Sequence, residues 1–217
     1  MPELKDVTLH LGNKIILDHF SIVIPSQGIT CLSGPSGCGK TTLIRVLTGL
    51  VQPDTGEVRG LEKGQVALLF QEDRLLPWRT AQENIADVLA KNNKDQVDMW
   101  LQEVELLEDA ATYPNALSGG MRRRVALARA LAYCMERPGP LDQGGRMLLL
   151  DEPFKGLDPA LRARMMQLVK RQHVPTLLIS HDAEEINIMA DRVFYLEGPP
   201  LQIKTEAVIE SESPPCH

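Results

Sequence analysis

The stretch from Gly34 to Thr42 constrains the fold of this chain more than any other feature. It reads Gly-Pro-Ser-Gly-Cys-Gly-Lys-Thr-Thr and fits the pattern G-x-x-x-x-G-K-[ST]. A short apolar run, Ile29–Leu32, precedes it, and leucines at helical spacing follow it. The sequence therefore predicts a strand, a glycine-rich loop and a helix in that order, which is the opening of an α/β domain.

A loop of this kind is suited to hold a polyphosphate. The glycines let the backbone curl so that N–H groups point inward, and the following helix adds its N-terminal amides and its positive dipole end. Lys40 can reach the β- and γ-phosphates, and the Thr41 hydroxyl can ligate Mg²⁺. A chance glycine-rich turn is the alternative, but the flanking strand and helix disfavour it. We expect nucleotide binding by Gly34, Pro35, Ser36, Gly37, Cys38, Gly39, Lys40, Thr41 and Thr42.

The rest of the chain alternates buried strands with helices. This alternation predicts a mainly parallel sheet that helices cover on both faces. A capping box, Thr80 with Glu83, starts a helix through about Ala90. The polar segment Gly56–Gly64 is expected to be turn-rich. Further strands are expected at Val66–Phe70, Met147–Leu150, Leu177–Ile179 and a terminal hairpin over Val193–Ile203, and further helices around Val97–Val104, from Ser118 to about Tyr133, and after Asp158.

Length and charge narrow the class of protein. A chain of 217 residues suggests one domain, or one domain with a small appended subdomain. The net charge of -6 argues against a general nucleic-acid surface, which needs basic excess. We see no secretory segment and no apolar run long enough to cross a bilayer, so a membrane role would need another chain. The scattered cysteines indicate neither a zinc site nor a disulfide framework.

Two acids at the end of a predicted strand complement the glycine-rich loop. Asp151 and Glu152 follow the apolar run Met147–Leu150. Alone, such acids are more often helix caps or solvated turns. Beside a phosphate loop, Asp151 is suited to hold Mg²⁺ and Glu152 to polarise the attacking water.

Further motifs occur in a fixed order along the chain. They are Gln71 after a predicted strand, Leu117-Ser118-Gly119-Gly120, Gly156-Leu157-Asp158 after Glu152-Pro153, and His181 within Leu178–Asp182. With the glycine loop and the acidic pair, they make residues 3–205 resemble the nucleotide-binding subunits of the ATP-binding-cassette (ABC) family. The resemblance implies an α/β P-loop NTPase with a mainly parallel sheet core, a small antiparallel β subdomain and a helical signature subdomain at about 72–134, in one domain over 1–217. We expect the tail 210–217 to be disordered.

The resemblance also implies residue roles. Glu152, His181 and Gln71 would be catalytic, and Thr41, Gln71 and Asp151 would hold the Mg²⁺ that accompanies ATP. Ser118, Gly119 and Gly120 would bind the γ-phosphate held by an opposite subunit, in a homodimer or with a paired ABC subunit. Each residue has a simpler reading: Ser118 as a helix N-cap, Gln71 as solvated, His181 as structural.

The segment from Gln71 to Thr80 resembles importers of nitrate, sulfonates and taurine. In such subunits it forms part of the groove that receives a permease, and Leu75–Trp78 would offer an apolar docking surface. Burial of Trp78 in the core is the alternative. The resemblance thus implies an ATPase subunit that powers solute import, cytoplasmic and peripheral on the inner face of the cell membrane. A non-transport ABC ATPase, an exporter subunit and another P-loop class are the rivals.

Some positions depart from the family pattern. Met121 replaces the usual Gln of the signature, and Leu11 stands where an aromatic residue usually stacks on adenine. The link Cys134–Gly145 is longer than usual. The run Arg122–Arg124 is interpreted as a mixed solvent and salt-bridge face of the helix.

Overall fold

The computed structural model describes residues 1–62, 64–91 and 93–209. Two compact units make up the chain. Unit 1 comprises residues 1–61 and the chain from Pro175 onward, and unit 2 comprises residues 62–174. The helical segment expected at about 72–134 lies within unit 2. The expectation for the tail 210–217 falls outside the described residues.

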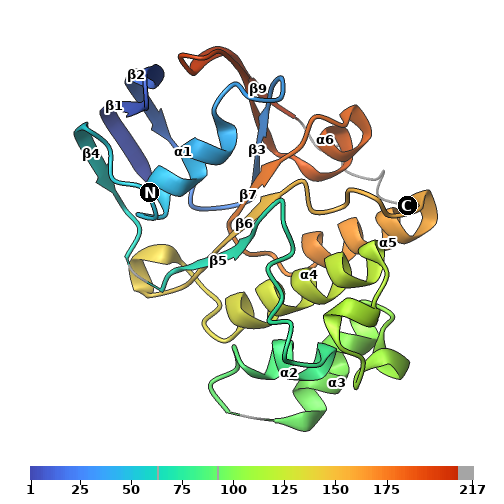
Figure 1. The fold of residues 1–217 in the computed structure, drawn as a ribbon. Coiled ribbons are helices and arrows are strands. Elements are labelled where there is room, and N and C mark those ends of the chain that lie inside the picture. Colours follow the sequence, from blue (N-terminus) through green and yellow to red (C-terminus); the bar gives the residue numbers. More distant parts are fainter. Residues whose placement is uncertain (63, 92, 210–217) are drawn as a thin grey trace, which may run out of the picture. The chain divides into compact units, whose positions relative to one another are not determined.

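The main strands of unit 1 are parallel (Figure 1). Strand β3 (Ile29–Ser33) lies between β7 (Thr176–Ile179) and β8 (Arg192–Glu197) and is parallel to both. Strand β9 (Gln202–Val208) is antiparallel to β8, which confirms the predicted hairpin. Every residue of β3 and β7 is buried, as expected of parallel strands covered on both faces.

A small antiparallel sheet forms the other part of unit 1, as predicted. Its strands are β1 (Glu3–Leu11), β2 (Lys14–Val23) and β4 (Thr55–Arg59), in the order β2-β1-β4. The prediction of a turn-rich segment from Gly56 was wrong for its first residues, because β4 pairs with β1 there. A Cβ at Gly56 would lie 2.4 Å from the Asp6 carbonyl oxygen, so close backbone approach explains a glycine inside this strand.

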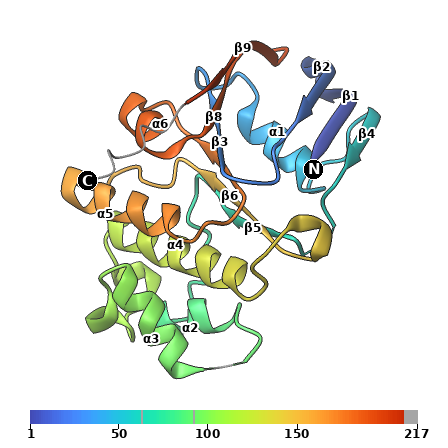
Figure 2. The same ribbon diagram turned by 180° about the vertical axis from the view of Figure 1, so that it is seen from behind.

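Helices cover the parallel strands of unit 1. Helix α1 (Lys40–Leu47) and helix α6 (Ala183–Met189) lie on opposite sides of β3 and β8 in both views (Figures 1 and 2). Helix α1 begins at Lys40, directly after the loop that leaves β3, as the sequence predicted.

Unit 2 is built around one long helix. Helix α4 (Gly119–Met135) packs on two parallel strands, β5 (Val66–Leu69) and β6 (Met147–Asp151). Helices α2 (Ala81–Ala86) and α3 (Lys94–Glu103) pack against α4. The described residues of the unit also form helix α5 (Pro159–Lys170) and the 3₁₀ helices η1 (Leu107–Asp109), η2 (Pro114–Ala116) and η3 (Leu141–Gln143).

The predicted helix starts at Thr80, Ser118 and Asp158 in unit 2 are confirmed. The Thr80–Glu83 capping box is formed in both directions, and Asp158 caps α5 ahead of Pro159. Helix α2 ends at Ala86 rather than near Ala90, since the N–H groups of Val88 and Leu89 bond three residues back and the Ala90 N–H donates to the Glu136 carboxylate at 3.0 Å. Within the described residues, no helix is both long and apolar enough to cross a membrane.

Candidate functional site

The glycine-rich loop leaves β3 and enters α1 with a backbone that only glycine fits. A Cβ at Gly34 would lie 2.3 Å from the Leu196 carbonyl oxygen, and Gly39 has a φ of 119°. Gly39 is also the N-cap of α1 and offers no side-chain cap to its first turn. Pro35, Ser36 and Gly37 are exposed. The loop thus presents exposed backbone at the positive end of a helix, the arrangement that binds phosphate.

The ammonium group of Lys40 is folded back onto this loop. Its Nζ donates to the carbonyl oxygens of Gly34 at 2.7 Å and Pro35 at 2.8 Å, and it lies 3.7 Å from the Cys38 Sγ. The cation is therefore held at the loop that the sequence assigned to phosphate, with its charge adjacent to the exposed backbone.

His181 lies at the same edge of the unit 1 sheet as the loop. Strands β3 and β7 are adjacent and parallel, with Leu32 paired to Ile179, so the segments that follow them leave from the same end. His181 is exposed. The Ser180 hydroxyl donates to the buried Glu185 carboxylate at 2.6 Å and accepts from the Asp182 N–H at 3.1 Å. These bonds fix the backbone on both sides of His181.

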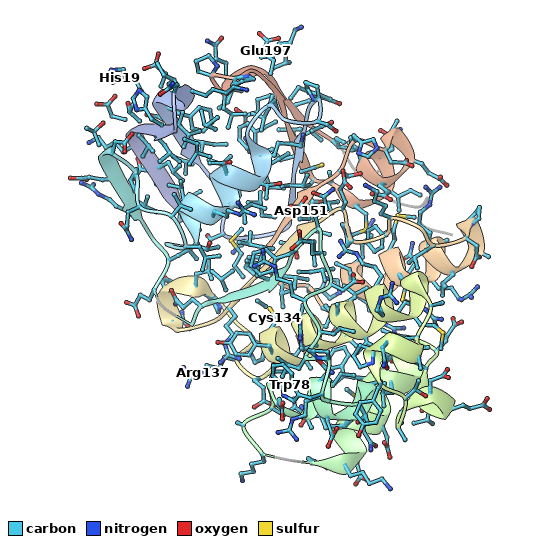
Figure 3. All side chains as sticks on the ribbon, viewed as in Figure 1. His19, Trp78, Cys134, Arg137, Asp151 and Glu197 are labelled. Carbon is cyan, nitrogen blue, oxygen red and sulfur yellow. The ribbon has the colours of Figure 1, made fainter. Side chains whose placement is uncertain are left out.

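Gln71 and the acidic pair lie at the carboxyl ends of adjacent parallel strands of unit 2, where Asp151 is the last residue of β6 and Glu152 follows it. Leu69 at the end of β5 pairs with Leu150 of β6, so Gln71, Asp151 and Glu152 leave the same edge. Asp151, labelled in Figure 3, is 3% exposed, whereas Gln71 is exposed. Glu152 has a φ of 48°.

The Glu152 carboxylate forms an ion pair with the Lys155 ammonium at 2.8 Å. The φ of Glu152 lies in the left-handed region, which is uncommon for a residue other than glycine. Backbone strain of this kind is typical of functional sites.

The start of α4 carries the serine and glycines of the predicted signature. The Ser118 hydroxyl accepts from the Met121 N–H at 3.2 Å, so the helix-cap reading of Ser118 is confirmed. Ser118 and Gly119 are exposed. A Cβ at Gly120 would lie 3.5 Å from Leu157 Cδ2, so this helix start is close to the turn after Glu152. Binding of a partner subunit's nucleotide here stays a prediction.

Arg123 is the residue that the sequence interpretation missed. The run Arg122–Arg124 was expected to face solvent and surface ion pairs, but the Arg123 side chain is only 5% exposed. Its spacing in the sequence could have indicated burial, because Arg123 lies on the same face of the helix as the buried residues Leu127, Ala130 and Cys134. Its guanidinium donates to the backbone carbonyls of both Gln71 and Glu152.

Oxygen donors dominate the residues that the sequence assigned to a metal. The part of the chain that the structure describes holds no cluster of three or more His, Cys, Asp or Glu side chains able to bind a metal by itself. Thr41, Gln71 and Asp151 each carry an oxygen donor of the kind that Mg²⁺ takes in proteins, beside phosphate oxygens and water, and their assignment to this ion stays a prediction.

Comparison with known proteins identifies the family. The sequence profile described as "ABC transporter" matches residues 17–155. The chain belongs to the ABC transporter family. Its fold is accordingly the α/β P-loop NTPase fold, as predicted. A dimeric ATP-binding cassette solved with ADP and Pi matches with a TM-score of 0.81 and 26% identity, over 97% of this chain and 100% of that one.

Curated relatives of this ABC chain are named as import ATP-binding proteins. The "Aliphatic sulfonates import ATP-binding protein SsuB 1" of Burkholderia lata is 39% identical over 202 residues, which are 89% of this chain and 60% of that protein. A protein of the same name in Pseudomonas savastanoi pv. phaseolicola is 38% identical over 94% of this chain and 83% of its own length. The chain thus spans about 60% of the length of the Burkholderia relatives that it matches.

Proposed function

We propose that this chain binds ATP with Mg²⁺ and hydrolyses it as one of two paired cassettes, powering solute import through a separate membrane permease. The glycine-rich loop carries the proposal: Gly34 and Gly39 leave no room or backbone conformation for side chains, and Lys40 holds its charge there. His181 supports it, because it follows the strand adjacent to the loop.

Each predicted residue has a defined part in this proposal. The backbone of Gly34–Thr42 and the Lys40 ammonium bind the β- and γ-phosphates, and Glu152 accepts a proton from the attacking water. Gln71 and His181 orient that water and the γ-phosphate. Thr41, Gln71 and Asp151 would hold Mg²⁺, which when bound neutralises phosphate charge. Ser118, Gly119 and Gly120 bind the γ-phosphate of the paired subunit, whether a second copy or another ABC chain.

Exposure of Trp78 supports a permease docking surface near Leu75–Trp78. The Trp78 side chain, labelled in Figure 3, is 70% exposed, so the alternative of a buried core residue is wrong. The turn that carries it is held by the buried Asn84, which accepts from the Leu76 N–H at 2.8 Å and donates to the carbonyls of Leu76 and Arg79. Pro77 beside it is exposed and Leu75 and Leu76 are half-buried, so Trp78 would be the most exposed member of a contiguous apolar patch, the kind of surface that marks an interaction site.

The relatives' names suggest the class of solute. Because they are described as importers of aliphatic sulfonates, we propose a small organic anion of that type for the complex. The chain would then act in the cytoplasm, on the inner face of the membrane, with the permease and not this subunit choosing the solute.

Two substitutions in the purified chain test the ATPase. We expect Lys40→Ala to weaken ATP binding, because about 1.5–3 kcal/mol of charge-assisted hydrogen bonding is lost. Glu152→Gln should retain ATP binding but lower turnover about 10²–10⁴-fold, since the base that activates water is gone. Phosphate release and nucleotide binding are measured on the same preparations. Unchanged ATP affinity in Lys40→Ala, or near-normal turnover in Glu152→Gln, would contradict the assigned roles.

A further inference from the structure

The guanidinium of Arg123 is a buried hub of hydrogen bonds within unit 2. All of its nitrogens donate. Nε donates to the Pro153 carbonyl at 3.2 Å. Nη1 donates to the Phe70 carbonyl at 2.6 Å, the Gln71 carbonyl at 3.3 Å and the Asp73 carboxylate at 3.2 Å. Nη2 donates to the carbonyls of Asp151 and of Glu152, the latter at 2.7 Å.

The acceptors belong to two separate stretches of chain. One stretch follows β5 and contains Gln71, and the other follows β6 and contains Glu152. Arginine alone among side chains offers five N–H groups in a rigid fork, so a single residue can hold both stretches at a fixed separation. Removal of the guanidinium would leave buried carbonyls without these donors.

The bonds also bear on the strained backbone at Glu152. A φ of 48° at a non-glycine residue persists only where the surroundings over-determine it. Arg123 bonds the carbonyls of Asp151, Glu152 and Pro153, the residue itself and both of its neighbours. Those bonds fix the direction in which the Glu152 side chain leaves the backbone.

Asp73 is the charged partner that makes the burial of Arg123 tolerable. Its carboxylate lies 3.2 Å from Nη1 and is itself 22% exposed. A buried cation without a partner would be strongly unfavourable. The second carboxylate oxygen of Asp73 lies 3.9 Å from Arg122 Nε, so two successive residues of α4 hold the segment after Gln71.

From this geometry we propose that Arg123 is a positioning residue for ATP hydrolysis: it fixes Gln71 and Glu152 in one relative position and ties both to the start of α4 at Ser118–Gly120. The proposal rests on the proposed ATPase function. Arg123 itself touches no reacting atom. Because it lies less than two helical turns after Ser118, a displacement of the start of α4 is passed to the backbone of Glu152.

Arg124 is a matched control on the same helix. Its guanidinium also donates to two backbone carbonyls, those of Val104 at 2.6 Å and Glu105 at 2.9 Å. These acceptors follow α3 and lie in neither stretch held by Arg123. Loss of either arginine removes carbonyl bonds, but only loss of Arg123 should disturb hydrolysis.

The test measures kcat, KM and ATP binding for the wild-type chain, Arg123→Gln, Arg123→Lys and Arg124→Gln. We expect Arg123→Gln to lower kcat by about 10- to 100-fold, because a misplacement near 1 Å in a catalytic group costs about that much. ATP affinity should stay within about threefold, since the phosphate loop is in unit 1. Arg124→Gln should keep kcat, and thermal unfolding reports the stability of each variant.

Two outcomes would overturn the proposal: an unchanged kcat in Arg123→Gln, or an equal fall in Arg124→Gln. If Arg123→Gln does not fold, Arg123→Lys decides, because it keeps the charge but loses the fork and should still lower kcat. In a Glu152→Gln background, Arg123→Gln should add no further loss, and an additive loss would contradict positioning through Glu152. A wild-type chain without ATPase activity would refute the proposed function itself, which separates the two failures.

Discussion

At the scale of single residues, burial decides which side chains of this chain are reactive. Cys31, Cys38 and Cys134 are free and buried. Burial raises the pKa of the Cys31 thiol to about 12, and it does the same for Cys134. Since the thiolate is the nucleophile, both residues should be inert at neutral pH.

The first prediction concerns these two thiols. In the folded protein at pH 8, Cys31 and Cys134 should resist maleimide labelling that proceeds readily in denaturant. Because the pKa of each thiol is higher in the folded chain than in the unfolded chain, the protonated thiols stabilise the folded state at pH values below their ordinary pKa of 9.0. That contribution should be lost as the pH rises from about 9 towards 12, because only the unfolded thiols ionise there.

Mass spectrometry of labelled peptides and urea titrations at several pH values check this prediction. Cys31→Ala should reduce the alkaline loss of stability. Rapid labelling of Cys31 at pH 8 in a chain shown to be folded would contradict it.

At the scale of helices and strands, local signals predicted most of the structure. The loop between β3 and α1 was predictable, because a loop that binds phosphate through its backbone N–H groups needs glycines at fixed spacing. Strand β4 was not, since its pairing with β1 depends on residues about 50 positions away, as in Lys5 with Glu57. The role of Arg123 was hidden for a similar reason: charge suggests a surface, and only tertiary packing supplies the carbonyls that make it buried.

The same limit applies to the candidate site. Residue types predict roles for Lys40, Asp151 and Glu152, because each has a chemistry that a phosphate-binding loop requires. The left-handed backbone at Glu152 has no signal in the sequence, since glutamate rarely adopts it. What fixes that backbone is a hydrogen-bond network across α4, β5 and β6, which no local pattern encodes.

The second prediction belongs to helix α2. Its capping box satisfies the Thr80 N–H through Glu83 at 2.8 Å and the Glu83 N–H through Thr80 at 3.4 Å. Thr80→Ala removes one of these bonds and should lower the free energy of unfolding by about 1 kcal/mol. Chemical denaturation measures it. Asn115→Ala, at an exposed position of η2, is the control and should stay within about 0.5 kcal/mol of the wild type. Equal free energies of unfolding for Thr80→Ala and the wild type would show that the cap does not stabilise the protein.

At the scale of the whole molecule, the proposed partner is a membrane protein. The exposed Trp78 gives a direct way to test that proposal. Trp78→Ala should reduce recovery of a multi-span protein when the tagged chain is purified from its native membranes, while leaving the basal ATPase rate unchanged. Leu107→Ala, at another exposed apolar residue of unit 2, is the matched control and should retain the partner. Recovery of a soluble partner or of nucleic acid instead would favour a non-transport ABC ATPase.

The order of strands in unit 1 has a consequence for synthesis on the ribosome. Every residue of strand β3 is buried, and both of its hydrogen-bonded neighbours, β7 and β8, come from the chain after Pro175. A nascent chain therefore makes β3 and the loop after it long before their neighbours exist. Unit 2 is translated whole in the interval and can fold first. Until β7 and β8 are synthesised, β3 lacks the strands that bury it, and the loop between β3 and α1 lacks the sheet that supports it.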